Sequence, residues 1–365
     1  MSYSCRIKLA ALCLVFGAVQ ALASEPTINI YNWSDNIGTG TVAGFEKASG
    51  IKIKYDVYDG DDTLIAKLLT GRTGYDVVYP STQYFNKEVE AGIFQKIDQK
   101  AIPNLAKIDK QVAALTAGTE SASKYAVPYT WGTDGFGFNL TAVKAALGAN
   151  VPLDSWDILF KPEYISKLSK CGVSILDSPS DVLPLALFYL HKDPNSKNPA
   201  DWQAAYQLFK TIRPYITQFN SSGYINDLAN NDICMAVAWS GDVGMAGRRA
   251  REAGKPYKIA YVLPKEGAPI WSEMMAIPKD AAHAADAMKW LNYIMDPKVS
   301  ADITRTIYYP LANAEAKQFL PADILNDPAV YPGAAMMQKL WAFKTLPTEI
   351  MRLQTRLWTQ LKTGR

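Results

Sequence analysis

The sequence predicts an α/β protein built from two lobes. Segments typical of buried strands alternate with segments typical of helices from residue 28 onward, which is the pattern of α/β folds. The same alternation starts again near residue 172. The chain has 365 residues, more than one hydrophobic core usually serves. These observations together predict two α/β units in one chain.

The first 23 residues read as a secretory signal peptide. Arg6 and Lys8 form a positively charged start, residues 9–19 are an apolar run, and residues 21–23 are an Ala-x-Ala cleavage site. The apolar run is too short to span a bilayer. We therefore expect an exported protein that loses this segment.

Residues 28–79 contain a βαβαβ pattern. Strands are predicted at 28–31, 51–57 and 75–79, and helices at 40–50 and 62–71. Asp61 or Asp62 is expected to cap the second helix. Crossovers of this kind place the carboxyl ends of parallel strands at one edge, where α/β folds bind ligands. Residues 33–36 and 81–83 follow two of these ends, so we expect them near a ligand.

Residues 125–139 are a candidate crossover to a second α/β unit. In that unit the pattern predicts strands at 172–176 and 234–239 and helices at 181–190 and 202–212. Strands at 257–263 and 272–277 could return to the first lobe, followed by a helix at 284–295. The last helix should cover a core face with its apolar positions, Ile350, Leu353, Leu357 and Leu361.

Composition and motifs exclude several classes of function. The 38 Lys and Arg nearly balance the 35 Asp and Glu, which argues against a nucleic-acid surface. The sequence has no phosphate-binding loop, no nucleophile motif and only two histidines without ligand spacing, so neither an enzyme nor a metal site is predicted. Cys171 and Cys234 remain after export and are expected to form a disulfide, with two free thiols as the alternative.

Aromatic residues stand beside acids at several predicted strand ends or loop entries. The pairs are Trp33 with Asp35, Trp239 with Asp242, and Trp271 with Glu273. Aromatic faces attract ammonium groups by about 0.5–2 kcal/mol each, and buried acids need partners. This pattern predicts capture of a small organic cation.

The sequence resembles a known family, the periplasmic polyamine-binding proteins of ABC transporters, and within this family it is most similar to the putrescine-binding type. The resemblance covers essentially the whole mature chain. It is carried by YNWSD at 31–35, LLTGRTGYDVVYPS at 68–81, VPYTWGTDGFGFN at 127–139, KCGVSILDSPSDV at 170–182, CMAVAWSGDV at 234–243, LPKEGAPIWSEMMAIPKDA at 263–281 and TRLWTQLKTG at 355–364.

The resemblance implies the two-lobe solute-binding fold of type II, with the ligand in the cleft between lobes. It implies a first lobe of residues 24–133 plus about 258–305, and a second of 134–257 plus about 306–365. It also implies a periplasmic location, no cofactor, and delivery of a polyamine (putrescine-like first, spermidine second) to an inner-membrane permease. We expect a monomer.

Carried over residue by residue, the family's ligand-binding positions fall on Trp33, Ser34, Ser81, Trp239, Asp242, Trp271 and Tyr309, with Gln83 at a variable position. Positions that depart from the family pattern are Asn36 for a tyrosine, Asp181 for a glutamate, Glu273 for an aspartate, Asp134 for a threonine and Gly244 for a tryptophan. The family disulfide falls on Cys171 and Cys234.

Two ammonium groups are expected to meet Asp242 with Glu273 at one end of the pocket and Asp181 at the other. Gly244 would make the pocket floor roomier. Asn36 motivates an alternative ligand, an ω-amino acid such as γ-aminobutyrate or 5-aminovalerate. A receptor that docks a signalling protein instead of a permease is a further alternative that the sequence leaves open.

Overall fold

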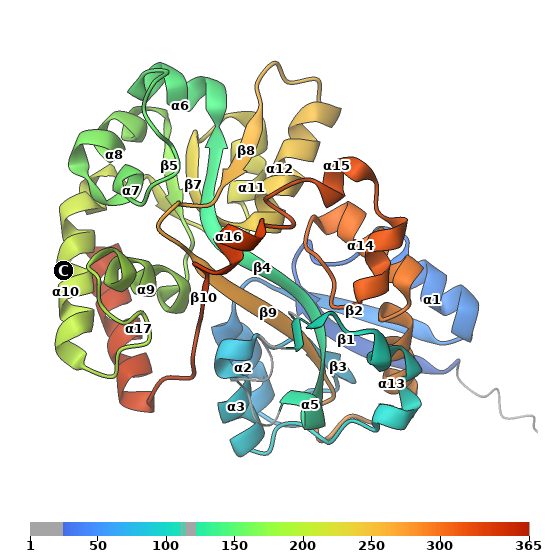
Figure 1. Cartoon of the computed structure of the whole chain (residues 1–365). Coiled ribbons are helices and arrows are strands. Elements are labelled where there is room, and N and C mark those ends of the chain that lie inside the picture. Colours follow the sequence, from blue (N-terminus) through green and yellow to red (C-terminus); the bar gives the residue numbers. More distant parts are fainter. Residues whose placement is uncertain (1–24, 111, 114–121, 365) are drawn as a thin grey trace, which may run out of the picture.

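A single mixed β-sheet runs through both lobes (Figure 1). The computed structural model describes residues 25–110, 112–113 and 122–364; the predicted signal peptide lies outside them. In this part of the chain ten strands follow the order β2-β1-β3-β9-β4-β7-β5-β6, with β10 beside β9 and β8 beside β4. None of the described helices combines the length and apolar character needed to cross a membrane.

The first lobe is formed by β1, β2, β3 and β9 with helices on both faces. β1 pairs in parallel with β2 and β3, as the βαβαβ pattern predicts, whereas β9 is antiparallel to β3. The elements are β1 (Thr27–Trp33), α1 (Thr41–Ser49), β2 (Lys52–Tyr58), α2 (Asp61–Leu69), β3 (Val77–Val78), α3 (Thr82–Glu90), η1 (Gln99–Ala101), η2 (Pro103–Lys107), α5 (Ala122–Tyr125), β9 (Pro269–Ala276), α13 (Ala284–Ile294) and α14 (Pro297–Ile307).

Alternation along β1 decides which helices cover which face of the first lobe. Ile30 packs into a core with Phe45 of α1 and Trp290 of α13. The next residue, Tyr31, points to the opposite face and packs with Leu64 of α2. Because side chains alternate along a strand, one lobe has two apolar layers with the sheet between them.

The long strand β4 (Ala126–Asn139) connects the lobes (Figure 1). Its first half pairs with β9 and its second half, from Asp134, pairs with β7 and β8. The predicted crossover is therefore one continuous strand. Of the two strands expected to return to the first lobe, only β9 does so, because β8 pairs with residues 136–139.

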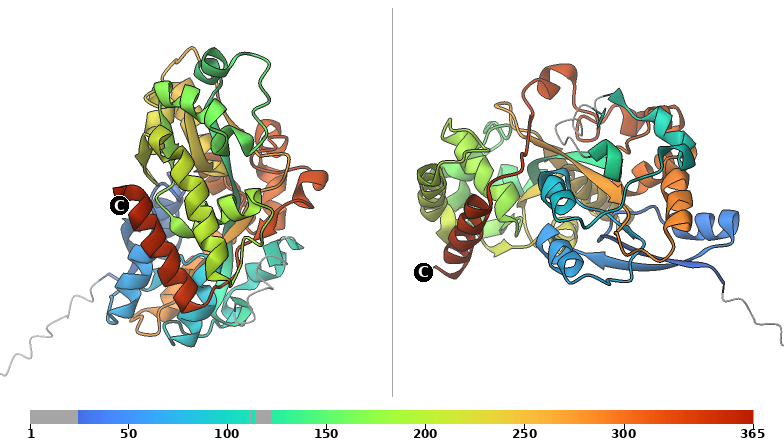
Figure 2. Two further views of the ribbon diagram at one scale, coloured as in Figure 1. Left: turned by 90° about the vertical axis from the view of Figure 1, so that its left-hand side faces the viewer. Right: turned by 90° about the horizontal axis from the view of Figure 1, so that it is seen from below.

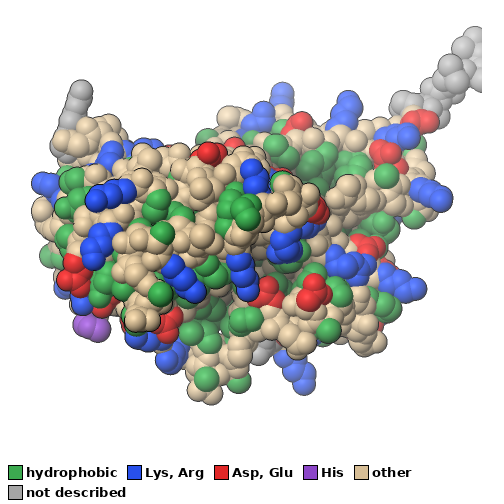
Figure 3. All heavy atoms as spheres, turned by 90° about the horizontal axis from the view of Figure 1, so that it is seen from above, with side chains coloured by type: hydrophobic (Ala, Val, Ile, Leu, Met, Phe, Trp, Pro, Cys, Tyr) green, Lys and Arg blue, Asp and Glu red, His purple; other side chains and the backbone are tan. Residues whose placement is uncertain are grey.

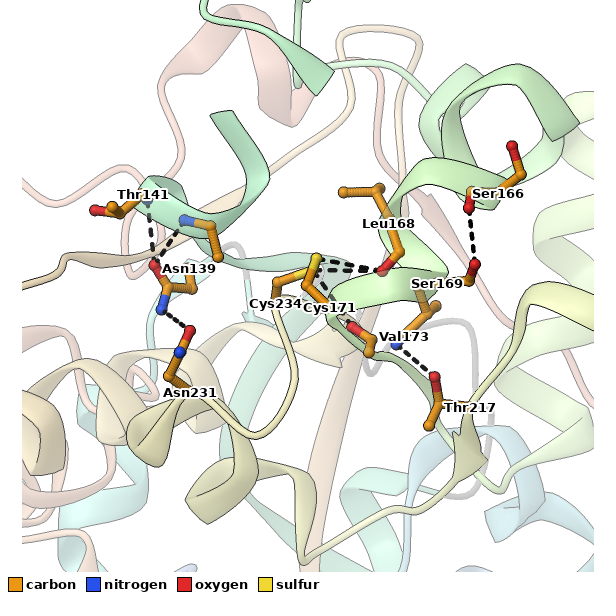
Figure 4. Close-up of a disulfide and its surroundings, with 12 residues drawn as sticks. Asn139, Thr141, Ser166, Leu168, Ser169, Cys171, Val173, Thr217, Asn231 and Cys234 are labelled. Carbon is orange, nitrogen blue, oxygen red and sulfur yellow. Dashed lines mark hydrogen bonds between the residues drawn. A yellow bond between two sulfur atoms is a disulfide. The ribbon is translucent and has the colours of Figure 1, made fainter. Parts of the chain in front are cut away.

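The second lobe repeats the α/β pattern. Its elements are α6 (Leu140–Leu147), α7 (Asp157–Phe160), α8 (Pro162–Leu168), η3 (Ser169–Cys171), β5 (Val173–Ile175), α9 (Pro179–Tyr189), α10 (Pro199–Ile212), η4 (Arg213–Tyr215), β6 (Gln218–Phe219), α11 (Tyr224–Asn230), β7 (Met235–Trp239), α12 (Ser240–Glu252) and β8 (Ile259–Val262). The predicted disulfide between Cys171 and Cys234 is confirmed and joins η3 to the start of β7 (Figure 4).

The C-terminal segment contacts both lobes before it ends on the second. It contains η5 (Ala314–Phe319), α15 (Ala322–Leu325), α16 (Ala334–Met337), β10 (Trp341–Ala342) and α17 (Thr348–Thr363). η5 packs on α14, β10 pairs with β9, and α17 lies beside α10 (Figure 2). The apolar positions predicted for the last helix are all buried, as expected.

Candidate ligand-binding site

The predicted ligand-binding residues all line one space between the two lobes, here called the inner cavity. It encloses about 650 Å³, part of it open to solvent. The predicted residues that line it are Trp33, Ser34, Asn36, Ser81, Gln83, Asp181, Trp239, Asp242, Trp271, Glu273 and Tyr309. Its remaining lining residues are Asp35, Tyr58, Asp59, Asp61, Ser221, Ser222 and Ile225.

Two tryptophans from different lobes meet across the inner cavity. Trp33 is the last residue of β1 and Trp239 is the last residue of β7, so both stand at strand ends as predicted. Their ring centroids are 5.9 Å apart with nearly perpendicular planes. The Trp33 indole donates hydrogen bonds to the Tyr79 carbonyl (3.0 Å) and to Oε2 of Glu273 (2.9 Å). This indole is therefore held in place by Tyr79, which follows β3, and by Glu273 of β9, and not by its sequence neighbour Asp35.

Trp271 occupies a different position from the one predicted. It lies inside β9 and not at a strand end or loop entry. Its indole N–H donates to Oδ1 of Asp134 on β4 at 2.8 Å. Gly132 on β4 makes room for the ring, because a Cβ there would lie 2.7 Å from the Trp271 side chain. Asp134 is fully buried behind Trp271, and burial, followed by the charge of Asp181, raises its pKa well above the usual range.

Asp242 sits in the first turn of α12 between two tyrosine hydroxyls. Tyr309 donates to Oδ1 at 2.6 Å and Tyr224 donates to Oδ2 at 2.7 Å. Burial raises the pKa of Asp242 to about 6, while the two hydroxyls oppose the rise. A carboxylate held in this way keeps free lone pairs for a cation while its position is fixed by the lobe.

A second acidic site, here called the acidic group, consists of Asp61, Asp181 and Glu273. Ser81 donates to Oδ1 of Asp61 at 2.6 Å, and the Gln83 amide donates to Oδ2 at 3.2 Å. Asp61 and Glu273 belong to the first lobe, whereas Asp181 lies on α9 of the second. The group therefore spans the cleft.

Burial dominates the protonation of the acidic group. It raises the pKa of Asp61 to about 6 and that of Asp181 to about 7. Burial also raises the pKa of Glu273 well above its usual range, and the charges of Asp61 and Asp181 add to this. The joint action of Glu273 and Asp242 on one ammonium group stays a prediction. The acids whose charges raise the pKa of Glu273 are Asp61, Asp181 and Glu88. This grouping arises because β9 lies next to β3 in the sheet.

Two further features of the site lie in the loop that follows β1, at Asp35 and Asn36. Asn36 is 7% exposed, and its side-chain Oδ1 has no hydrogen-bond partner within the described ranges. Asp35 has a left-handed backbone (φ 55°) and forms an ion pair at 2.8 Å with Arg249 of the second lobe. The Asp35–Arg249 pair thus connects the lobes at the edge of the cavity.

Sequence reasoning missed the role of Asp61 and misjudged Gly244. The helix α2 is capped by the backbone of Gly60 without a side-chain bond, so the predicted cap at Asp61 or Asp62 was wrong. The run of acids in 59–62 was the available signal. Gly244 does not line the inner cavity: a Cβ there would lie 2.6 Å from the Tyr308 side chain, so the expected roomier floor is absent.

No Lys, Arg or His is among the residues that line the inner cavity in the described part of the chain. No Lys, Arg or His is among the buried residues of the described chain, and on the face in Figure 3 basic side chains are spread among acidic, apolar and neutral ones. Within the described ranges no cluster of His, Cys, Asp and Glu has the arrangement of a metal site. Buried carboxyl groups without basic partners, enclosed by aromatic faces, suit an organic cation.

Comparison with known proteins agrees with this class of site. Residues 40–332 match the model of the bacterial extracellular solute-binding protein family, and the chain belongs to this family. It is 46% identical to the putrescine-binding periplasmic protein SpuD of Pseudomonas aeruginosa, over 96% of this chain and 95% of that protein. It is 43% identical to the putrescine-binding periplasmic protein PotF of Escherichia coli, over 96% of this chain and 97% of PotF.

The fold is similar to that of solved structures. A putative spermidine/putrescine ABC transporter protein from Listeria monocytogenes superposes with a TM-score of 0.82 at 29% identity, covering 93% of this chain and 99% of that chain. This likeness matches the predicted two-lobe α/β architecture with its cleft.

Proposed function

We propose that this protein is the periplasmic solute-binding component of an ABC importer for polyamines, with a putrescine-like diamine as its ligand. The observation that carries the proposal is one inner cavity with two separate carboxylate sites, aromatic walls and no basic side chain among its lining residues. The names of the relatives, putrescine-binding periplasmic proteins and a spermidine/putrescine ABC transporter, agree with it.

The two carboxylate sites divide the ligand between them. One ammonium group is bound by Asp242, whose oxygens are already oriented by Tyr224 and Tyr309. The other is bound by the acidic group. The faces of Trp33 and Trp239 then pack against the methylene chain, because apolar contact and cation–π attraction act on neighbouring parts of such a ligand.

Cation binding also supplies a reason for the lobes to close. The acidic group places Asp61 and Glu273 of one lobe against Asp181 of the other. Negative charges on both sides of the cleft oppose closure, and an ammonium group between them converts that repulsion into attraction. We propose that closure occurs about β4, the link from β8 to β9 and the segment before α17, and that the closed form is delivered to the permease.

The ω-amino acid alternative is less favoured by the cavity. A ligand carboxylate would need a cation or several donors, and the inner cavity offers acids at both carboxylate sites and no Lys or Arg among its lining residues. Asn36 alone would have to stabilise the ligand carboxylate, and a single amide does not offset the cost of burying a charge.

Calorimetric titration of ligand-stripped mature protein with putrescine, cadaverine, spermidine, γ-aminobutyrate and 5-aminovalerate tests the proposal. We expect a dissociation constant near micromolar, about −8 kcal/mol, for at least one polyamine. Heat of binding from an ω-amino acid, with none from any polyamine, would overturn it.

A further inference from the structure

Asp134 is a buried acid to which the proposed function gives no role. It lies where β4 passes from one lobe to the other: Thr133 is the last residue paired with β9, and Asp134, opposite Trp239, is the first paired with β7. Its side chain is fully buried and does not line the inner cavity. Asp134 can therefore act on a ligand in two ways, by its charge or through the residues that it contacts.

The surroundings of Asp134 suit a neutral carboxyl group. Oδ1 accepts the Trp271 indole N–H at 2.8 Å, whereas Oδ2 has no hydrogen-bond partner in the described part of the chain. Burial, and then the charge of Asp181, raises the pKa of Asp134. Burial is also the main cause of the raised pKa of Tyr224 and of Tyr261, and the charge of Asp134 adds to both. Because a buried carboxylate without a cation is costly, Asp134 keeps its proton at neutral pH.

The contact with Trp271 leads from Asp134 to the carboxylate of Asp242. The Trp271 ring packs against the Tyr309 ring, with centroids 5.4 Å apart, and Tyr309 donates to Oδ1 of Asp242 at 2.6 Å. Gly132 faces both rings, because a Cβ there would lie 2.7 Å from Trp271 and 3.0 Å from Tyr309. Side chains packed this closely move together, so a rotation of the Trp271 ring would also displace Tyr309.

The indole N–H of Trp271 explains why an acceptor is needed at position 134. Without Asp134 the N–H would stay unpaired, at the cost of a lost hydrogen bond, or the ring would turn to find another acceptor. Trp271 lines the inner cavity, where carboxyl groups are the strongest acceptors. A turned indole would therefore compete with a ligand ammonium for the same oxygens.

We propose that Asp134 is a positioning residue for ligand binding, which as a neutral acid holds the Trp271 ring, and through it Tyr309 and Asp242, in the arrangement that receives a ligand ammonium. The inference rests on the proposed function. It requires a hydrogen-bond acceptor at position 134 and no negative charge there.

Calorimetry at pH 7 with putrescine, cadaverine and spermidine compares the mature wild type with Asp134→Asn and Asp134→Val. Asparagine has the shape of the neutral acid and keeps an acceptor oxygen, so the Kd of each polyamine that binds should stay within about twofold. Valine suits a strand but cannot accept the indole N–H, and it should raise the Kd about five- to tenfold.

A matched control is Asp177→Val. Asp177 also accepts an indole N–H, from Trp358 at 2.8 Å, and it pairs with Lys362 at 2.7 Å, but it does not line the inner cavity. Loss of this partly exposed carboxylate should leave the Kd within about twofold. An equal rise of the Kd in Asp177→Val and Asp134→Val would show a general effect of losing an acid and would overturn the inference.

A double-mutant cycle with Trp271→Phe tests whether Asp134 acts through the indole. Phenylalanine keeps an aromatic ring but has no N–H to pair, so Asp134→Val should change the Kd of the Trp271→Phe protein by less than about twofold. A five- to tenfold loss that persists in this background would contradict the positioning role, because residue 134 would then act by another route.

The outcomes separate this inference from the proposed function. A wild type that binds none of the three polyamines would overturn the proposed function. Polyamine binding by the wild type, with a Kd within about twofold in Asp134→Val, would overturn the positioning role alone. Asp134→Asn decides the matter even when Asp134→Val does not fold, because a loss of about tenfold or more in Asp134→Asn would show that Asp134 acts by its charge.

Discussion

Replacement of Asp242 by asparagine should weaken ligand binding and stabilise the ligand-free protein. Burial raises the folded-state pKa of Asp242 from its ordinary value of 3.8 to about 6. For an acid with a raised pKa, the folded state disfavours the ionised form, so the ionised group destabilises the fold above pH 6 and this effect vanishes as the pH falls below 4. This rise in the pKa of Asp242 corresponds to about 3 kcal/mol of lost folding stability at pH 7.

The asparagine side chain would remove this electrostatic destabilisation but keep an oxygen that accepts from one tyrosine. The other tyrosine hydroxyl would lose its acceptor, at about 1 kcal/mol. We expect Asp242→Asn to be about 1–2 kcal/mol more stable than the wild type without ligand, with a Tm higher by about 1–3 °C for a chain of this length. Loss of the charged partner of a ligand ammonium should cost about 2–4 kcal/mol, or a factor of about 30 to 1,000 in Kd.

Calorimetry with putrescine and thermal denaturation at pH 7 measure the two effects. A matched control is Asp157→Asn outside the cavity, where a carboxylate also accepts a tyrosine hydroxyl, from Tyr189 at 2.9 Å, and pairs with Lys161. Partial burial there acts to raise the pKa, but hydrogen bonds from Lys161 and Tyr189 leave it lowered. Asp157→Asn should thus be slightly less stable, with unchanged Kd. An Asp242→Asn protein that binds putrescine within threefold of wild type, or that melts lower without ligand, would refute the reasoning.

Three further predictions concern pH, the disulfide and the contact between lobes. Polyamine affinity should fall by about 100-fold or more from pH 8 to pH 5. The amines stay protonated over this range, whereas carboxyl groups such as Asp181, with a pKa of about 7, become neutral. An affinity that calorimetry finds unchanged between pH 8 and pH 5 would contradict this prediction. Replacement of both Cys171 and Cys234 by serine should lower the free energy of unfolding by about 4 kcal/mol, given their separation of 63 residues; unchanged urea denaturation would show that the bridge is dispensable. Arg249→Gln should speed ligand release up to about fivefold, because it removes a partly exposed ion pair with Asp35 that connects the two lobes. An unchanged off-rate in stopped-flow tryptophan fluorescence would show that this ion pair does not slow ligand release.

Patterns of apolar and turn-forming residues in the sequence predicted helices and strands well where local signals alone define an element. The helix predicted at 40–50 is α1, and its end at Gly50 follows from the left-handed backbone there, φ 72°. The strand predicted at 75–79 is only Val77–Val78. Only Val77 and Val78 pair with β1, and only Val78 pairs with β9; such long-range pairing leaves no mark in a local pattern.

The tryptophan–acid pairs show where sequence proximity misleads. Trp33 was paired with Asp35 by adjacency, but its indole bonds Glu273, which is 240 positions away in the chain. Trp271 was paired with Glu273, yet its indole bonds Asp134. Trp271 and Glu273 share a face of β9, because they are two positions apart on one strand. Each nevertheless bonds a residue of another strand, Asp134 on β4 and Trp33 on β1, so the partner of a side chain is decided by the neighbouring strands.

By itself the sequence determined the α/β class, the family, the cysteine pair and the set of predicted residues that line the inner cavity. Only the tertiary structure decided how these residues are grouped. The insertion of β9 between β3 and β4 brings Glu273 to Asp61, and the approach of α9 to α2 across the cleft adds Asp181. Grouping of this kind depends on contacts between segments far apart in the chain, because burial and charge act through space and not along the sequence.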